Sequence, residues 1–351
     1  RNIGGCVRAS FSCGSARQAC VAPNHQRSTI TTARASQQGD TADDTTTNGV
    51  SMNTVTRTNE RRLAVITGAV SGIGASLAEL LVSTGWRLVL LNRSANRTKP
   101  LISKLLTIDA DAQCDVIETD LSDHASLQAA AMQVTEQYGS VDALFNNAGV
   151  LRSDMVISAN GNELHFEVNT LAPYLLTRAL SSALRNAVEV RGRAVVVTPS
   201  TSAIKMVKAL DIATLRRGSK GGLTGAYAQS KLAWAVLNEH LAAEYREDGI
   251  ELFAVDPGIN RTGMTTSSGA PLPVRLIWRL LPKPSVGAAR LAAVLDEKWR
   301  GRSGTLLLGG KPKPIPSHAA TQQTAMELLS IIEDAETSGV ISETVPKAKL
   351  T

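Results

Sequence analysis

The chain has 351 residues, of which 43% are hydrophobic and 19% charged, and its formal net charge is +6. The apolar share can build a large buried core, and the length is enough for one large α/β domain with appendages. No run approaches 18 apolar residues, so the sequence predicts no transmembrane helix. The positive charge does not indicate a nucleic-acid partner, because five arginines and no acidic residue fall within the first 39 residues. Of the four cysteines only Cys114 lies in the globular part, so neither a disulfide framework nor a metal site is predicted.

The N-terminal segment, residues 1–58, differs from the rest in composition. It is rich in Ser, Thr, Ala and Arg, is poor in acids and shows no hydrophobic periodicity. That composition is typical of an organelle transit peptide, which would direct the protein to a plastid or mitochondrion. The alternative is a plain disordered tail, which would leave the protein in the cytoplasm. We expect residues 59–337 to form the single folded domain and residues 338–351 a flexible tail.

A strand, a glycine turn and a helix follow one another at the start of this domain. Residues 63–66 are an apolar run of the kind that a buried parallel strand needs. Three glycines follow at once, and a helical apolar pattern then begins. Glycines let the backbone approach a pyrophosphate, and a helix N-terminus offers it free N–H groups. The spacing alone could belong to an ordinary tight turn. The predicted cofactor contacts here are Gly68, Ser71, Gly72, Ile73 and Gly74.

The end of the second strand, residues 87–91, indicates which dinucleotide binds. Enzymes that use NAD(H) commonly carry an acid about 20 residues beyond the glycines, and this acid binds the ribose 2′-OH. Arg93 occupies this place, and its neighbours Asn92 and Ser94 are not acidic. Because a guanidinium can pair with a 2′-phosphate, we predict NADP(H) rather than NAD(H). The alternative is a solvated loop arginine.

The ends of later strands predict further ligand contacts. After the third strand, residues 116–119, Asp120 and Leu121 lie where ligands bind in doubly wound sheets. Asp120 can bind the adenine or else cap the next helix. The fourth strand, residues 141–145, leads into Asn146-Asn147-Ala148-Gly149, whose small residues suit close passage of the backbone beside a cofactor.

A Tyr-x-x-x-Lys pair lies in the helix predicted for residues 225–247. Tyr227 and Lys231 are four residues apart, so both side chains lie on one helix face. A lysine cation favours a phenolate, and the phenol can give a proton to a carbonyl oxygen or take one from an alcohol. Ser200, just after the fifth strand, can hydrogen-bond the same oxygen.

A polar residue also lies inside the long helix predicted for residues 164–184. Asn169 stands among apolar residues, where an unpartnered amide would be costly to bury. It can hold a water that links Lys231 to solvent. Pro173 lies in the same helix, and we expect a kink there. Across the domain, strands alternate with helices. This pattern predicts a single Rossmann-type, doubly wound parallel sheet of about seven strands with helices on both faces.

In this order, the motifs resemble those of the short-chain dehydrogenase/reductase family, over about residues 62–309. The resemblance implies an oxidoreductase that uses a nicotinamide cofactor. It places Asn169, Ser200, Tyr227 and Lys231 at the catalytic tetrad, with Tyr227 and Lys231 also touching the cofactor. The remaining implied cofactor contacts follow strands four and six: Asn147, Ala148, Gly149, Pro257, Gly258, Ile259 and Thr262.

Within the family, the stretches Tyr-Ala-Gln-Ser-Lys-Leu-Ala and Asp-Pro-Gly look most like the retinol-dehydrogenase-type branch. The plastid protochlorophyllide reductases are a related branch. Their cysteine after Pro-Gly is Ile259 here, which argues against that activity. Asp256 stands where many relatives have His.

One catalytic position also departs from the family pattern. Pro199 replaces the first serine of the usual Ser-Ser pair. This leaves Ser200 as the expected catalytic hydroxyl, with Thr198 or Ser202 as alternatives.

Three functions fit these observations. The first is an NADP(H)-dependent carbonyl reductase or alcohol dehydrogenase for a small apolar substrate, with Tyr227 as general acid/base. The second is an organelle pigment or lipid reductase related to the protochlorophyllide enzymes. The third is a catalytically silent NADP-binding protein, against which the intact Tyr227 and Lys231 count. A homo-oligomer is compatible with each.

Residues 274–283 combine Trp278 and several leucines with interleaved basic residues. Segments that lie in a membrane interface have this composition, so peripheral membrane contact beside the substrate entrance is one prediction. The alternative is a lid helix packed over the pocket.

Overall fold

The computed structural model describes residues 61–218 and 225–338. The predicted N-terminal segment (1–58) and all but the first residue of the predicted tail (338–351) lie outside the described residues. Among the helices that are described, none is both long enough and apolar enough to cross a bilayer.

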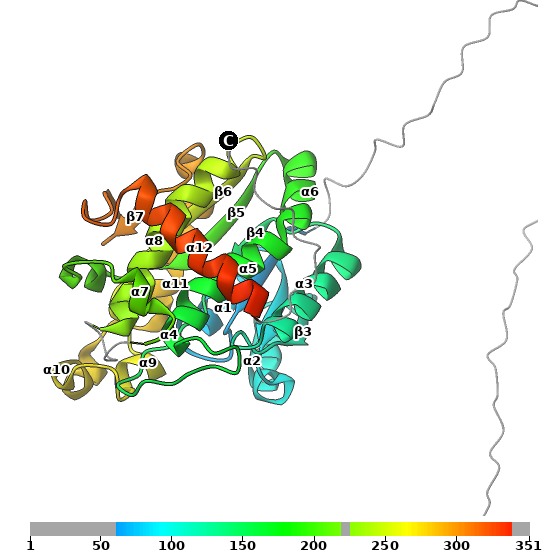
Figure 1. The fold of residues 1–351 in the computed structure, drawn as a ribbon. Coiled ribbons are helices and arrows are strands. Elements are labelled where there is room, and N and C mark those ends of the chain that lie inside the picture. The colour runs from blue at the N-terminus through cyan, green and yellow to red at the C-terminus, as the bar shows by residue number, and fades with distance from the viewer. Residues whose placement is uncertain (1–60, 219–224, 339–351) are drawn as a thin grey trace, which may run out of the picture. The chain divides into compact units, whose positions relative to one another are not determined.

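The described residues fold around one eight-stranded sheet (Figure 1). Its strand order is β3-β2-β1-β4-β5-β6-β7-β8, and all neighbours are parallel except β7 and β8. The strands are β1 (Leu63–Thr67), β2 (Arg87–Asn92), β3 (Cys114–Glu118), β4 (Ala143–Phe145), β5 (Ala194–Pro199), β6 (Ile250–Val255), β7 (Leu306–Leu308) and β8 (Lys311–Lys313). The order confirms the predicted doubly wound sheet, in which the chain leaves β1 toward β2 on one side and returns through β4 on the other.

The sheet has one strand more than the seven predicted. Lys-Pro-Lys in β8 has no apolar alternation, so its pattern did not predict a strand. The strand forms because Gly309 and Gly310, with φ of 61° and 76°, close a two-residue turn after β7. All three residues of β8 are exposed, and proline and lysine are tolerated in such an edge strand.

Successive residues of the central strands point to opposite faces and build two separate cores. Leu63 and Val65 belong to the core beneath α3 (His124–Tyr138), α5 (Ala172–Ala179), α6 (Ser181–Arg191), α8 (Ala226–Glu244) and α12 (Gln322–Ser338). Ala64 and Ile66 belong to the core beneath α1 (Gly72–Ser83), α2 (Ala95–Ile108) and α11 (Pro284–Ala292). Figure 1 shows α12 crossing over α8, and the two helices are in contact. Helices on both faces were predicted, and the structure confirms them.

The helix predicted over residues 164–184 is not continuous. It consists of α4 (Leu164–Phe166), the π-helical turn η1 (Glu167–Leu171), α5 and α6. Pro173 lies in the first turn of α5, directly after η1. Because proline has no N–H, it cannot bond the carbonyl four residues before it, and the expected kink takes the form of this wider turn. A second break falls at Leu180, with φ of −93° and ψ of 5°.

Several short elements surround the carboxyl ends of the strands or follow α11. The helix α11 ends at Ala292 and gives way to two 3₁₀ turns. These elements are η2 (Ser202–Met206), α7 (Ile212–Leu215), α9 (Gly263–Thr266), α10 (Leu272–Leu276), η3 (Trp278–Leu280), η4 (Ala293–Leu295) and η5 (Glu297–Trp299). Of these, η2, α9 and α10 contribute to the walls of the site described next.

Candidate active site

A cleft of about 870 Å³, open to solvent, lies at the carboxyl ends of the central strands. The loops after β4, β5 and β6 contribute to its walls, together with α8, α9 and α10. The sequence-predicted residues that line it are Ile73, Asn147, Gly149, Ser200, Tyr227, Lys231, Pro257, Gly258, Ile259 and Thr262. The structure therefore brings the predicted acid–base residues and the loops after strands four and six into one site.

The glycine turn after β1 lies against the loop after β4. A Cβ atom on Gly68 would come within 3.0 Å of Ala148, and Gly68 has a φ of 67°. A Cβ on Gly74 would lie 2.4 Å from Nδ2 of Asn147 and 2.5 Å from the carbonyl oxygen of Gly68. The Asn147 amide donates to that same carbonyl at 3.1 Å. Side chains at these glycines would thus force the two loops apart.

The same turn fits the pyrophosphate of a dinucleotide. Ser71 precedes α1 without forming a side-chain cap, so the hydroxyl does not occupy the N–H groups of the first helical turn. Gly72 has a φ of 62°, and a Cβ there would come within 3.2 Å of the Thr262 methyl group. Free N–H groups and the positive end of the helix dipole favour an anionic ligand.

The predicted adenosine contacts lie farther along the strand ends. Arg93 is exposed and makes no hydrogen bond or ion pair with any residue that the structure describes. Asn92, just before it, is fixed because its Oδ1 accepts an N–H of the glycine turn at 2.8 Å. Asp120 does not cap α3, since Asp123 does so. Instead, Asp120 Oδ1 accepts the N–H and the hydroxyl of Ser122 at 2.9 and 2.7 Å, and its adenine contact stays a prediction.

Tyr227 lies in the first turn of α8, lines the cleft and is only 7% exposed. Burial raises the pKa of its phenol to about 12, and the nearby Asp256 carboxylate acts in the same direction. A hydrogen bond with the Thr201 side chain has the opposite effect on this pKa. The phenol is therefore protonated at neutral pH and can donate a proton.

Lys231 lies one helical turn beyond Tyr227 and is 3% exposed. Its Nζ donates to the carbonyl oxygen of Pro199 at 2.8 Å. Burial lowers the pKa of this ammonium to about 8. An ammonium has three donors, so N–H groups beyond the one used by Pro199 can serve a ligand in the cleft.

Of the three hydroxyls considered at the end of β5, the structure favours Ser200. Thr198 is fully buried and accepts the Asn146 amide at 3.3 Å, away from the cleft lining. Ser202 is exposed, and its backbone N–H donates to Asp256 at 3.1 Å. Ser200 lines the cleft, and its buried Oγ has no hydrogen-bond partner in the part of the chain that the structure describes. That oxygen is free to bind a ligand.

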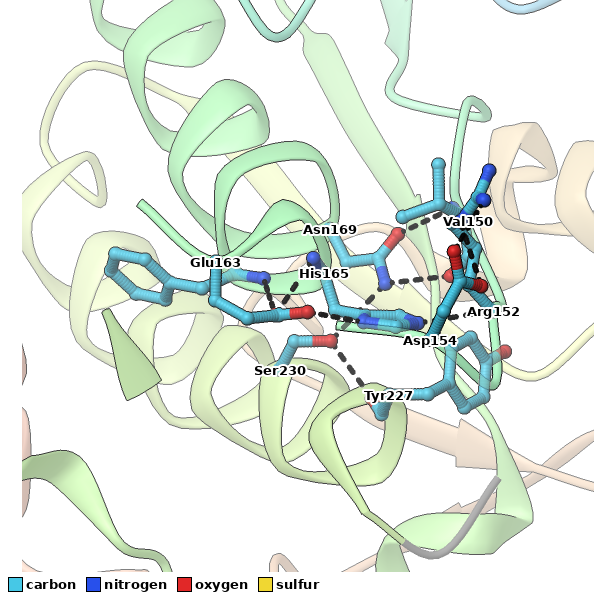
Figure 2. Close-up of polar contacts among 9 residues, drawn as sticks. Val150, Arg152, Asp154, Glu163, His165, Asn169, Tyr227 and Ser230 are labelled. Atoms are coloured by element: carbon cyan, nitrogen blue, oxygen red, sulfur yellow. Dashed lines mark hydrogen bonds and ion pairs between the residues drawn. The ribbon is translucent and has the colours of Figure 1, made fainter. Parts of the chain in front are cut away.

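Asn169 is not part of the cleft lining, and Figure 2 shows it between Val150 and Ser230. Its Oδ1 accepts the N–H of Val150 at 2.9 Å, and its Nδ2 donates to the Val150 carbonyl at 3.0 Å. The same Nδ2 donates to Oγ of Ser230 at 3.1 Å, and that hydroxyl donates to the carbonyl of Tyr227 at 2.8 Å. The side chain thus links the loop after β4 to helix α8. Its predicted role in holding a water stays a prediction.

Sequence patterns missed several residues of the cleft. Asp256 was noted only as a departure from the family pattern, although it follows β6 directly and both of its oxygens hold backbone N–H groups. Thr201 is one of several hydroxyl residues after β5, and the sequence alone does not show which of them faces Tyr227. The apolar lining residues that carried no sequence signal are Leu151, Met264, Ala270 and Pro271. They come from segments without regular periodicity.

A sequence model of the short chain dehydrogenase family matches residues 62–272. The chain belongs to this family. It is 31% identical to human retinol dehydrogenase 12 over 79% of this chain and 88% of that protein. It is 28% identical to human polyprenol dehydrogenase over 81% of this chain and 87% of that protein. These relatives confirm the predicted retinol-dehydrogenase-like branch.

Solved structures share the fold of this short-chain dehydrogenase. Levodione reductase superposes with a TM-score of 0.55 at 22% identity, over 70% of this chain and 95% of that chain. A short chain dehydrogenase from Burkholderia cenocepacia in complex with NADP gives a TM-score of 0.56 at 24% identity, over 71% and 96%. As a family member, the protein is an NAD(P)-dependent oxidoreductase that acts on CH–OH groups.

The buried Lys231 predicts a specific pH dependence of stability. Its pKa is about 8 in the folded protein and about 10.4 in an unfolded chain. Between these values the unfolded chain binds a proton that the folded protein does not, so the free energy of unfolding rises with pH, by up to about 3 kcal/mol. Lys231→Met abolishes this rise. Urea unfolding from pH 7 to 10.5 should therefore show the stability of wild type increasing relative to the variant.

The matched control is Lys99→Met, which removes an exposed lysine on α2. Its stability difference from wild type is expected to stay constant over the same range. A constant difference for Lys231→Met as well would show that burial does not perturb this lysine.

Proposed function

We propose that the protein interconverts an apolar aldehyde or ketone and the corresponding alcohol, with NADP(H) as the preferred cofactor. The observation that carries this proposal is the Ser200 Oγ, which has no hydrogen-bond partner among residues 61–218 and 225–338 and shares one cleft with the Tyr227 phenol and the Lys231 ammonium. A carbonyl oxygen placed between the two hydroxyls would accept a hydrogen bond from each.

The proton chemistry follows from the environments of these groups. When bound, the reduced nicotinamide ring supplies a hydride to the carbonyl carbon. Tyr227 donates its proton to the carbonyl oxygen as that oxygen gains charge, and the product is the alcohol. Ser200 stabilises the same oxygen by donating a hydrogen bond. Lys231, cationic below its pKa of about 8, favours the phenolate left behind. Oxidation of the alcohol is the reverse of these steps.

The walls of the cleft favour an apolar substrate. Leu151, Met264, Ala270, Pro271 and Val274 are among the residues that line it, and apolar walls bind apolar ligands without leaving polar groups unpaired. The names of the two human relatives describe dehydrogenases of retinol and polyprenol, which are long apolar alcohols. A long-chain or isoprenoid aldehyde or alcohol is the substrate class we propose.

Replacement of Tyr227 by Phe tests the acid–base assignment. The change keeps the ring and removes the proton, so we expect kcat to fall by at least roughly 10²-fold. NADPH binding, followed by cofactor fluorescence, should persist. Ser200→Ala should also lower kcat, without loss of stability, because its Oγ makes no internal hydrogen bond within the described residues. The assay is reduction of retinal, citral and decanal.

Tyr138→Phe is the control for Tyr227→Phe, because it removes a phenol that is not part of the cleft lining and that donates to Asp115 of the edge strand β3 at 2.9 Å. It should leave turnover unchanged. Near-normal reduction by Tyr227→Phe would refute the assignment.

The cofactor preference is proposed from Arg93. Its guanidinium is exposed after β2 and unengaged within the described residues, so it can turn toward a 2′-phosphate without breaking a contact. Hydrogen bonds to charged groups contribute about 1.5–3 kcal/mol, or roughly 10- to 100-fold in affinity. The glycine turn adds no second cation, since Ser71 is neutral. This supports a moderate preference for NADPH.

Arg93→Asp should invert this preference, because a carboxylate repels the phosphate and accepts from a ribose hydroxyl. The measurement is kcat/KM with NADPH and with NADH. Lys99→Asp, which changes the charge by the same amount at an exposed position of α2, should leave the ratio near that of wild type. An unchanged ratio in Arg93→Asp would identify Arg93 as a surface arginine.

We also propose that the segment from α10 to α11 contacts an anionic membrane. Leu272, Leu276 and Leu280 are 62%, 76% and 83% exposed, and Arg275 and Arg279 lie between them. Exposed leucines beside basic residues suit the headgroup region of a bilayer. Pro271 and Val274 of the same segment line the cleft, which also suits the alternative role of a lid. An apolar substrate could thus enter from the lipid.

Pelleting with liposomes of phosphatidylcholine and phosphatidylglycerol tests this contact. Wild type should pellet at low salt and less at high salt, because the attraction is partly electrostatic. Leu276→Ser with Leu280→Ser should abolish pelleting. Met326→Ser, which alters a 49% exposed methionine on α12, is the control and should pellet like wild type. If the wild-type protein stays in solution at low salt, the membrane contact is refuted and the lid remains as the interpretation of this segment.

A further inference from the structure

Two buried histidine–carboxylate pairs lie along the helical segment behind the cleft. His165 and Glu163 are 0% and 1% exposed, and Nδ1 of His165 lies 2.7 Å from Oε1 of Glu163. His124 and Glu167 are 2% and 0% exposed, and Nε2 of His124 lies 2.5 Å from Oε1 of Glu167. Neither pair lines the cleft. The two pairs differ in the other residues that they contact, and we use this difference to assign a separate role to each pair.

The hydrogen bonds of His165 define its tautomer. The backbone N–H of Arg152 donates to Nε2 at 3.0 Å, so Nε2 is the acceptor. Nδ1 must then carry the proton and donate it to Glu163. Glu163 also accepts the N–H groups of His165 and Phe166 at 2.8 and 3.2 Å, which caps the start of α4. An ionised carboxylate satisfies all three donors.

The His165 ring also contacts the catalytic tyrosine. Its centroid lies 6.4 Å from that of the Tyr227 ring, with the planes at 78°, which is an edge-to-face arrangement. Figure 2 shows the imidazole between Glu163 on one side and Arg152 on the other, with the Tyr227 ring nearby. Leu151, the residue before Arg152, packs with Tyr227 in a small apolar cluster. His165 therefore contacts the Tyr227 ring directly. It also holds the Leu151–Arg152 segment, which packs against the same tyrosine.

We propose that Glu163 and His165 form a positioning pair for Tyr227. Glu163 fixes the orientation and tautomer of the imidazole. The imidazole in turn holds the phenol ring and the Leu151–Arg152 backbone in the geometry that proton transfer requires. This inference rests on the proposed function of Tyr227 as proton donor.

The second pair supplies the comparison within the same molecule. Glu167 accepts hydrogen bonds from Ser158 and Asn162, both at 2.8 Å, and so anchors the loop before α4. No contact between His124 and Tyr227 is found among the described residues. Loss of either histidine leaves a buried carboxylate without its partner, so both changes should reduce stability. Only loss of His165 should disturb the reaction.

The variant His165→Asn retains a donor for Glu163 but lacks both the ring and the acceptor for the Arg152 N–H. We expect its kcat for reduction of retinal, citral or decanal to fall about 10-fold or more, since a misplacement of about 1 Å can reduce rate 10²-fold. KM for NADPH should stay within about twofold of wild type. His165→Gln, whose oxygen can reach the Nε2 position, should recover part of the rate. His124→Asn, compared at a temperature where circular dichroism shows all variants folded, should keep the wild-type kcat.

A readout without turnover separates this proposal from the proposed function. Hydrogen exchange of the Arg152 amide, measured on the full chain, should be faster in His165→Asn than in His124→Asn or wild type. If no carbonyl is reduced by wild type, the proposed function fails, and this exchange still decides whether His165 holds the loop. Unchanged kcat in His165→Asn, or an Arg152 amide that exchanges as in His124→Asn, would overturn the positioning role.

Discussion

Two backbone segments can approach closely enough to contact the same ligand only where no side chain separates them. This constraint applies to the glycine turn after β1 and the loop after β4. The Asn147 amide bridges the carbonyls of Thr67 and Gly68 at 3.0 and 3.1 Å. The Ala148 N–H donates to the Thr67 hydroxyl at 2.9 Å. These bonds join the glycine turn to the loop after β4. The cleft, the N-terminus of α1 and the helix α8 that carries Tyr227 are all positioned relative to this junction.

Local patterns predicted the parts of the structure that depend on sequence neighbours. The apolar strands, the glycine turn and the i, i+4 spacing of Tyr227 and Lys231 each have a short-range cause, and the parallel sheet confirms the predicted fold class. The edge strand β8 escaped prediction because a turn and a neighbouring strand create it, not its own apolar pattern. Asp256 and His165 escaped for a related reason. Their importance comes from residues far along the chain, such as Tyr227, which only the folded structure brings near.

The site contains polar groups that a core selected for stability alone would not hold. Lys231 is buried with a lowered pKa, and the Ser200 hydroxyl is buried without a partner in the described part of the chain. An unsatisfied buried polar group destabilises a fold by about 1–3 kcal/mol. The two apolar cores on either face of the sheet offset these costs. Buried polar groups of this kind fit the proposed function, in which a substrate oxygen would bind to them in a site shielded from water.

The π-helical turn η1 sets the phase between two stretches of helix. A π turn accommodates one residue more than an α-helical turn of the same rise, and each residue of an α-helix rotates the following side chains by about 100°. Glu163 and His165 lie before this turn, whereas α5, which packs into the core, lies after it. If the extra residue were absent, the helix could keep either the packing of α5 in the core or the polar contacts of Glu163 and His165, but not both. The π turn thus changes the rotation of α5 relative to α4. As a result, α5 can pack into the hydrophobic core while Glu163 and His165 keep their contacts near Tyr227, which a continuous α-helix would not allow.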